Sequence, residues 1–411
     1  MKRILIFSLN YYPRFIGGAE VAIKEITDRI NPEEIEFHMV TLRFDSTLPK
    51  IEKIGNVMVH RIGFAKKNPS IGDLKRMPLH LNKYMYQIIA VAKAHQLHKQ
   101  YSFDGIWAMM AHATGSPAAL FKAIHSEVTY LLTLQEGDPT DHIEKLARPI
   151  WFRPAWFFFS RAFTKADILQ SISGFLLSWG TNMGFSGMGY VIPNGVDVEL
   201  FSQRFSEAQK SEMQEKLSKK KGDIFLVTTS RLVHKNGIDD VIRALPLLPS
   251  NVTFLIYGIG PDEEMLRRLA RELKVEERAR FMGQIEHRDI PLVLSACDIF
   301  IRPSRSEGMG NSFIEAMAAR VPVVATQEGG ISDFMYDTKR NPETPTTGFV
   351  VDVNSPKQIV EVVTHIMSNP EVVIPVLDTA SALVRENYNW AHSASDMKKI
   401  FVSMGPASKT R

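Results

Sequence analysis

The chain has a single cysteine among its 411 residues, which excludes an intramolecular disulfide bond. Long apolar runs are also missing, and no stretch approaches the ~18 apolar residues that a membrane-spanning helix needs. Net charge is only +4, too small an excess of bases to argue for binding to nucleic acid. What remains is an ordinary globular composition at a length that favours two domains.

The N-terminus superficially resembles a signal peptide, with two bases followed by an apolar run. That run is short, from Ile4 to Phe7, and no small-residue cleavage site follows it. A first β-strand is the better interpretation. Low cysteine use is compatible with a reducing compartment, and we expect a cytoplasmic protein.

Apolar strand-like runs alternate with helical patterns, which predicts parallel strands joined by crossover helices. A first series ends near Val191, and a second begins after the Asn194-Gly195 turn and a polar segment reaching Lys221. The expected strands are 4–9, 37–42, 57–62, 104–110, 128–134, 224–229, 253–257, 280–282, 298–301 and 322–325, with helices at 19–30, 117–124, 311–320 and 389–401. We therefore expect two α/β domains that meet near residue 193.

The segment from Arg302 to Met317 is the most informative part of the chain. A strand-like run leads into a glycine loop, and a helix follows that loop. Glu307 lies on the loop, and Glu315 lies about one turn into the helix. The free amides at such a helix start form an anion site suited to a diphosphate, and two nearby carboxylates suit a ligand with hydroxyls. On spacing alone, a plain helix start with surface acids stays open.

Glu307 and Glu315, with the Glu315–Ala319 and Val321–Thr326 runs, resemble the E-x7-E signature of retaining glycosyltransferases of family 4. The resemblance implies the α/β GT-B fold, in which two Rossmann-like domains face a central cleft. It implies an acceptor-binding domain over 1–192, a donor-binding domain over 193–385, and a helix within 386–411 that crosses back onto the first domain. The family has glycine where Arg320 follows Ala319, a departure expected to affect only the end of the helix.

Arg231 and Lys235 lie between a strand and a helix, and they resemble the family's S-R-L…K-x-G element that holds the donor diphosphate. By the same resemblance, Glu307 contacts the donor sugar and Glu315 the ribose, and the loop Gly329–Asp333 closes the donor side. The expected catalytic residues are Glu307, Arg231 and Lys235. The expected donor-binding residues are Gly17, Gly18, Arg231, Lys235, Gly258, Ile285, Glu307, Gly308, Met309, Gly310, Asn311 and Glu315.

On the acceptor side we expect His112, Gln135 and Glu136. Many relatives have histidine where this chain has Gln135, and glutamine forms hydrogen bonds but cannot titrate. Glu20, beside Gly17-Gly18, is either part of the family's G-G-x-E element or a first-turn acid that complements its helix dipole. A structural role for His112 also stays open.

The implied reaction moves a sugar from a UDP- or GDP-linked donor to a hydroxyl of a glycan or lipid-linked acceptor, with retention. A front-face mechanism, in which the leaving phosphate accepts the acceptor's proton, is favoured by the resemblance. No D-x-D motif is present, so we expect no metal ligands and no cofactor. A non-catalytic partner that binds sugar nucleotides, and a sucrose-type synthase, remain alternatives.

Residues 145–165 contain five bases, no acid and seven aromatic side chains. Together with Lys75, Arg76, Lys83, Lys93 and Lys99, this composition suits an anionic membrane surface at the inner face of the cell membrane. The alternative is that the aromatic side chains belong to the core of the first domain. Both interpretations stay open at the level of sequence.

Overall fold

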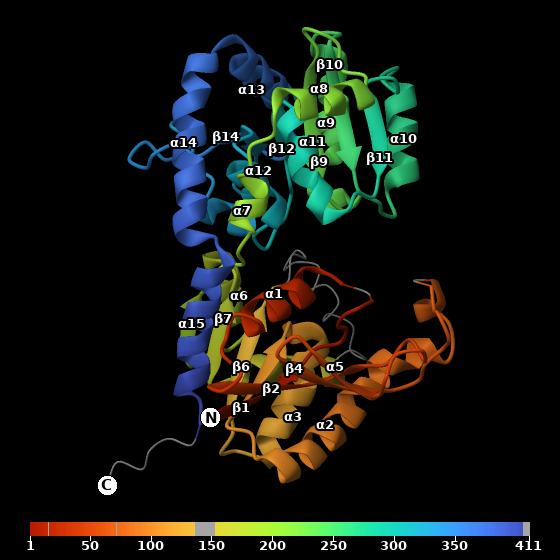
Figure 1. Cartoon of the computed structure of the whole chain (residues 1–411), viewed down its shortest axis with the longest axis vertical. Helices are drawn as coiled ribbons and strands as arrows, with labels where there is room; N and C mark the ends of the chain where they lie inside the picture. The colour runs from red at the N-terminus through yellow and green to blue at the C-terminus, as the bar shows by residue number, and fades with distance from the viewer. Residues whose placement is uncertain (15, 71, 136–152, 406–411) are drawn as a thin grey trace. The chain divides into compact units, whose positions relative to one another are not determined.

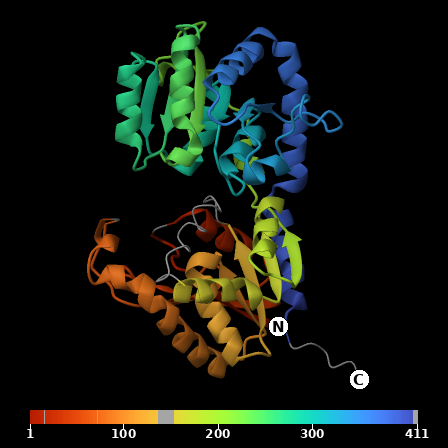
Figure 2. The same ribbon diagram turned by 180° about the vertical axis from the view of Figure 1, so that it is seen from behind.

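The computed structural model describes residues 1–14, 16–70, 72–135 and 153–405, and it divides into two compact units. Unit 1 comprises Met1–Asn194 with Trp390–Arg411, and unit 2 comprises Gly195–Asn389. The sequence places these boundaries before residues 193 and 386; in the structure they lie at 194/195 and 389/390. The last helix, α15 (Trp390–Ser403, blue), lies among the red-to-yellow elements of unit 1 in both views (Figures 1 and 2).

The sheet of unit 1 has the strand order β3-β4-β2-β1-β5-β6-β7-β8, parallel except for β3 against β4. Its strands are β1 (Lys2–Phe7), β2 (Ile35–Leu42), β3 (Ile51–Ile54), β4 (Val57–Ile62), β5 (Gly105–Met109), β6 (Thr129–Leu134), β7 (Ile168–Ser171) and β8 (Met188–Val191). The run Ile4–Phe7 is fully buried, as expected for a strand with neighbours on both sides and helices on both faces. This places β1 at the centre of the unit.

Helices cover both faces of this sheet (Figure 1). They are α1 (Gly18–Thr27), α2 (Asn82–Tyr101), α3 (Ser116–Ile124), α5 (Arg153–Thr164), α6 (Gly174–Asn182) and α15, with the short helices η1 (Gly72–Lys75), η2 (Leu79–Leu81) and η3 (Ala111–Gly115). α15 packs against α1, and the ring centroids of Phe401 and Trp107 lie 5.1 Å apart. α2, α3 and α5 form a second group, because α3 contacts both of the others.

A chain of buried polar groups crosses the strands from β5 to the end of β8. The indole of Trp107 donates to Thr133 at 2.7 Å, Thr133 donates to Gln170 at 2.7 Å, and Gln170 donates to the carbonyl of Ile192 at 2.7 Å. Each of these groups would be costly to bury alone. Because each polar group finds its partner on or just after the next strand, these hydrogen bonds fix the register of this half of the sheet.

Unit 2 has an all-parallel sheet in the order β11-β10-β9-β12-β13-β14 (Figure 1). The strands are β9 (Ile224–Thr229), β10 (Val252–Tyr257), β11 (Ala279–Gly283), β12 (Ile299–Arg302), β13 (Val323–Ala325) and β14 (Phe349–Val350). The helices are α7 (Val198–Phe201), α8 (Glu207–Lys216), α9 (Ile238–Ala244), α10 (Glu263–Glu272), α11 (Ile290–Ala296), α12 (Asn311–Ala318), α13 (Pro356–Ser368) and α14 (Pro370–Asn387), with the short helices η5 (His234–Asn236), η6 (Leu245–Leu247), η7 (His287–Asp289) and η8 (Gly329–Asp333).

Both units are therefore α/β with Rossmann-like parallel sheets, which confirms the fold class expected from the sequence. The ten expected strands correspond to strands of the structure, with bounds that differ by a few residues. Helix α12 ends at Ala318 rather than at residue 320. In the described residues no single helix could span a membrane by length and hydropathy, although α13 and α14, bent by 100°, meet that test as a pair.

Candidate functional site

The strand order of unit 2 reverses between β9 and β12. From β9 the chain moves outward to β10 and β11, then returns to place β12 on the other side of β9. Loops that leave the carboxyl ends of two such strands diverge, and open α/β sheets bind ligands in the crevice between them. Arg231 and Lys235 follow β9, and Glu307 follows β12. The topology therefore brings the expected catalytic residues to one edge of unit 2.

The loop after β9 is held in shape by a hydrogen bond within it and by one from the loop after β12. The amide of Asn236, which is buried, donates to the carbonyl of Arg231 at 2.6 Å. The backbone N–H of Arg305 donates to the carbonyl of Lys235 at 2.6 Å. The Arg231 side chain is exposed and that of Lys235 is half-buried. Two cations on a braced loop suit an anionic ligand at this edge.

Glu307 forms a buried ion pair. Its Oε2 accepts a hydrogen bond from Arg302 at 2.9 Å, and its Oε1 accepts the N–H of Gly308 at 3.0 Å. The carbonyl of Glu307 accepts the N–H of Gly330 at 3.0 Å, which joins this loop to η8. Burial lowers the pKa of Arg302, while the charges of Glu307 and Glu315 oppose that change. The carboxylate is thus held in one orientation beside a permanent cation.

Arg305 joins the loops that follow β9 and β12. Its guanidinium donates to both carboxylate oxygens of Asp239, at 2.8 and 3.0 Å, and to Asp240 at 2.8 Å. It also donates to the carbonyl of His234 and to the side chain of Asn354, each at 2.6 Å. Asp239 and Asp240 lie in the first turn of α9. The Arg305 side chain therefore fixes the loop that carries Arg231 and Lys235 (the cation loop) relative to the loop that carries Glu307 (the Glu307 loop).

Helix α12 begins with no side-chain cap, because its N-cap residue is Gly310. Gly310 has a φ of +86°, a conformation that glycine adopts at little cost. The first amides of the helix are therefore available to an anion, aided by the positive end of the helix dipole. The preceding Gly308 and Met309 are buried, and Asn311 is half-buried. At the far end, Arg320 takes the left-handed conformation, with a φ of +58°, at the position where the resemblance led us to expect glycine.

Glu315 is buried one turn into α12 and is already paired. Its Oε1 lies 2.9 Å from Nε2 of His287, which is on η7 after β11. The ring of His287 contacts Phe201 of α7 edge-on at 5.2 Å. A ribose that reached Glu315 would use its second oxygen or displace the imidazole.

The glycine turn after β10 brings two loops into contact. Gly258 has a φ of +132°, and a Cβ there would lie 1.8 Å from the carbonyl oxygen of Ser230. Its N–H donates to the carbonyl of Gly283 at 2.7 Å. Only glycine allows this approach. Ile285 is half-buried on the loop after β11. Gly258 and Ile285 therefore lie at the carboxyl ends of the strands, as the cation loop does.

Unit 1 repeats the same topology, because β5 returns beside β1 after the chain has visited β2 and β4. Gly17 is the N-cap residue of α1 and Gly18 is its first residue, and both are exposed. The N–H of Gly17 donates to Oε2 of Glu20 at 2.7 Å. Burial raises the pKa of Glu20, although this hydrogen bond opposes the shift. Glu20 therefore caps its own helix, and the Gly17 amide is occupied.

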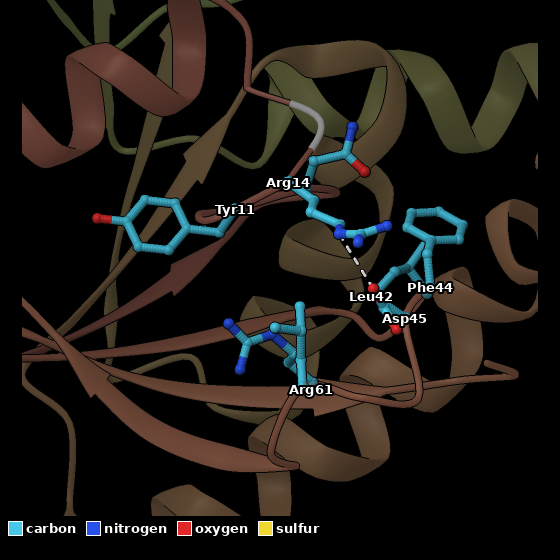
Figure 3. A pocket seen from close by; sticks show the side chains of 8 residues that line it. Tyr11, Arg14, Leu42, Phe44, Asp45 and Arg61 are labelled. Carbon is cyan, nitrogen blue, oxygen red and sulfur yellow. Dashed lines mark ion pairs between the residues drawn. The ribbon is translucent and has the colours of Figure 1, made fainter. Parts of the chain in front are cut away.

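The loop after β1 is also tied to the loop after β2 by an ion pair, drawn as a dashed line in Figure 3. Nε of Arg14 lies 3.0 Å from Oδ2 of Asp45. The hollow beside them has a volume of about 10 Å³, close to that of one water molecule. In Figure 3 the hydroxyl of Tyr11 points away from Arg14 and Asp45. The ion pair supports the loop, and the hollow beside it is too small to hold a sugar.

The expected acceptor residues lie at the carboxyl ends of β5 and β6. His112 is exposed on η3, after Met110, whose φ is +74°, an uncommon value for a residue with a side chain. Gln135 exchanges hydrogen bonds with the buried amide of Asn194, at 3.1 and 3.4 Å. Glu136 lies outside the described residues. The topology thus brings His112 and Gln135 to the edge that carries Gly17 and Gly18.

One group of side chains in the described residues has spacing that could suit a metal ion: His98, His125 and Glu127. However, Nδ1 of His98 accepts the N–H of Phe103 at 3.1 Å. Its proton must then be on Nε2, which faces Glu127 at 3.7 Å. A nitrogen that carries a proton cannot bind a metal ion, so His98 does not fit as a ligand.

Arg302, Arg305 and His287 were not assigned roles by the sequence analysis. Each forms its contacts with residues of another loop or element. The only signal for Arg302 is its place at the end of an otherwise apolar strand. For His287 and Arg305 the sequence offers none, because each resembles an ordinary surface residue.

Comparison with known proteins relates the part of the chain that carries this site to a family. The profile of the family described as Glycosyl transferases group 1 matches residues 209–390. A Corynebacterium glutamicum protein, named GDP-mannose-dependent monoacylated alpha-(1-6)-phosphatidylinositol monomannoside mannosyltransferase, is 30% identical over 255 residues, covering 58% of this chain and 63% of that protein. A Mycolicibacterium smegmatis relative, named GDP-mannose-dependent alpha-(1-6)-phosphatidylinositol monomannoside mannosyltransferase, is 30% identical over 236 residues, 55% of this chain and 59% of its own length. The chain thus spans about three fifths of these relatives.

Solved structures match over nearly the whole chain. Sucrose-phosphate synthase from Thermosynechococcus elongatus has a TM-score of 0.78 at 18% identity, with 98% of both chains covered. Anabaena HepE in complex with UDP-glucose has a TM-score of 0.74 at 20% identity, covering 98% of this chain and 100% of that one. At this identity the two structures establish the shared fold.

Proposed function

We propose that this chain, whose residues 209–390 match the profile of the group 1 glycosyl transferases, transfers a sugar from a nucleotide diphosphate to an acceptor hydroxyl. One observation carries the proposal. At the switch point of unit 2, an uncapped helix start, two exposed or half-buried cations and an oriented carboxylate lie on neighbouring loops. That combination suits a diphosphate joined to a polyhydroxylated group.

Each group has a defined task in this proposal. Arg231, Lys235 and the first amides of α12 stabilise the charge that develops on the leaving diphosphate. Glu307 accepts hydrogen bonds from hydroxyls of the donor sugar, and Glu315 accepts them from the ribose. The leaving phosphate takes the acceptor's proton on the same face, so the configuration at the sugar carbon is retained. Because the protein's own cations neutralise the diphosphate, the reaction needs no metal ion.

The donor is a UDP- or GDP-linked hexose. The names of the two mannosyltransferase relatives cite GDP-mannose, while one structural neighbour was solved with UDP-glucose. The test is release of UDP or GDP from UDP-glucose, UDP-galactose, UDP-N-acetylglucosamine and GDP-mannose, in EDTA. Turnover of one donor, reduced at least ~100-fold by Lys235→Ala and by Glu307→Ala, would support the proposal. If a donor binds but is not turned over with any acceptor, the chain would instead be a non-catalytic protein that binds sugar nucleotides.

We further propose that the acceptor is a lipid-linked glycan or glycolipid and that unit 1 meets an anionic membrane surface. Helices α2, α3 and α5 contain six bases and no Asp or Glu. α3 contacts both α2 and α5. Their exposed apolar side chains are Tyr84, Ile88, Leu120, Ile124, Phe157 and Phe158. An acid-free group of helices with outward apolar side chains suits a bilayer that carries negative charge.

The aromatic segment that suggested this surface divides between core and solvent. Phe159 and Phe163 are buried, as the core interpretation expects, whereas Phe157 and Phe158 are exposed. Arg161 stacks over Phe157 at 4.6 Å. Residues 145–152, including Trp151 and Phe152, lie outside the described residues. Lys75 lies on η1 and Arg76 follows it, both before α2, which carries Lys83, Lys93 and Lys99.

Sedimentation with vesicles tests this part of the proposal. The full chain should bind vesicles with an anionic lipid more tightly than neutral ones, and Ile88→Asp should weaken that binding. Ile374→Asp is the matched control, because Ile374 is a similarly exposed isoleucine on α14 of unit 2. Equal and negligible binding of the wild type to both vesicles would overturn the membrane assignment and leave the donor reaction standing.

A further inference from the structure

Arg302 is an unusual residue for its position. It ends β12, whose other members are Ile299, Phe300 and Ile301, and it is itself only 6% exposed. A guanidinium is strongly disfavoured away from water unless it is paired and hydrogen-bonded. The partners that compensate for this burial therefore indicate what Arg302 does.

Those partners all belong to the loop and helix of the donor site. One terminal nitrogen donates to Glu307 at 2.9 Å, and the other donates to Ser312 at 2.9 Å. The guanidinium lies over the ring of Phe313 at 4.1 Å. Arg302 thus connects the loop carboxylate to the first turn of α12.

Gly310 makes room for this arrangement. A Cβ at Gly310 would lie 2.6 Å from Nη2 of Arg302, the same nitrogen that binds Glu307. Any other residue would push the guanidinium away from the carboxylate. The glycine loop therefore accommodates a buried cation beneath it as well as a ligand above it.

We infer that Arg302 is the positioning residue that orients Glu307 toward the donor sugar, an assignment that rests on the function proposed above. Arg302 holds one carboxylate oxygen and the Gly308 amide holds the other, so the side chain cannot turn away. Each oxygen keeps a second lone pair for a sugar hydroxyl. Because Arg302 is buried beneath the loop, it acts through Glu307 and does not touch the donor.

The test compares a nucleotide alone with a nucleotide that carries a sugar. We would measure the affinity of UDP and GDP, the affinity of the donor found by turnover, and kcat, for the wild type, Arg302→Met, Glu307→Gln and the double variant. Arg302→Met should lower kcat by at least about tenfold while changing nucleotide affinity less than about threefold. In the Glu307→Gln background, Arg302→Met should lower kcat by less than about threefold, because the residue it orients is already altered.

Two further variants separate positioning from a general loss of structure. Arg302→Lys keeps the charge but can reach only one of the two partners, so its kcat should fall between those of the wild type and Arg302→Met. Arg278→Met is the control, since Arg278 also donates to backbone carbonyls of unit 2, at Val252 and Pro249, but beside the amino ends of the strands, away from the candidate site. Its kcat should match the wild type.

Equal loss of nucleotide and donor binding in Arg302→Met, or independent effects of Arg302→Met and Glu307→Gln on kcat, would overturn the inference. A kcat for Arg302→Lys no better than for Arg302→Met would also contradict it. Failure of the wild type itself to bind any nucleotide sugar would instead refute the proposed function on which the inference stands. The wild-type measurement thus distinguishes the two failures.

Discussion

Replacing Arg305 with alanine should both destabilise unit 2 and loosen the donor site. The Arg305 side chain is 14% exposed, and those of Asp239 and Asp240 are 13% and 5% exposed. Removing one partner of a buried ion pair costs about 3–5 kcal/mol, mainly because the remaining charge is left uncompensated. For a unit of this size each kcal/mol shifts Tm by roughly 2–4 °C, so we expect a fall of roughly 6–20 °C.

The pH dependence of that loss follows from the two carboxylates. Burial, followed by the charge of Asp239, raises the pKa of Asp240, and Arg305 opposes this rise. Without Arg305 the folded-state pKa of Asp240 should rise further. A carboxyl group with a raised folded pKa favours the folded state below its unfolded pKa, and that contribution is lost as pH rises through the folded pKa. The stability deficit of Arg305→Ala should therefore be larger at pH 7 than at pH 5.

Chemical denaturation and UDP or GDP binding, each at both pH values, measure these effects. Because the Arg305 side chain binds the carbonyl of His234, next to Lys235, nucleotide affinity should also fall by about tenfold or more when that side chain is removed. Arg340→Ala is the control, since Arg340 forms an exposed ion pair with Asp352 and should cost less than about 1 kcal/mol. Equal stability of the Arg305→Ala and Arg340→Ala variants, with unchanged nucleotide affinity, would refute the reasoning.

Three other predictions follow from the same contacts. Gly310→Ala should lower kcat by at least about tenfold, because its Cβ displaces Arg302; unchanged kinetics would show that the loop adapts. Burial lowers the pKa of His60 to about 4, so folding stability should fall by up to about 3 kcal/mol as pH drops from 6.5 to 4, and His60→Phe should reduce that dependence in denaturation curves. His287→Ala frees Glu315, so nucleotide affinity should change several-fold while kcat at saturation stays near that of the wild type; a large loss of kcat would contradict a role limited to the ribose.

The strands that the sequence predicted contain a buried apolar run, such as Ile4–Phe7 in β1 and Phe225–Val227 in β9, because both faces of a central parallel strand are buried. The strands it missed are short or lie near sheet edges. β8 has four exposed residues, and β3 alternates between exposed and half-buried ones. Nothing in their local sequence distinguishes them from loops, since their pairing depends on the neighbour that the fold supplies.

The candidate site divides in a similar way. Glu307 and Glu315 were placed correctly on a loop and on the following helix, because a glycine loop between a strand and a helical pattern is a local feature. The partners of these two carboxylates were not predicted. Arg302 is five residues from Glu307 in the chain, but its role depends on being buried, and His287 is 28 residues from Glu315.

The sequence by itself determined the α/β class, the two series of strands and the helix start that suits a diphosphate, since each depends on the order of residues along a short segment. Only the tertiary structure decided which loops meet. The reversal of strand order beside β9 brings the cation loop to the Glu307 loop, and Arg305 joins them across 66 residues of chain. Such contacts arise from the order in which the parallel strands lie in the sheet, and no local pattern of residue types encodes them.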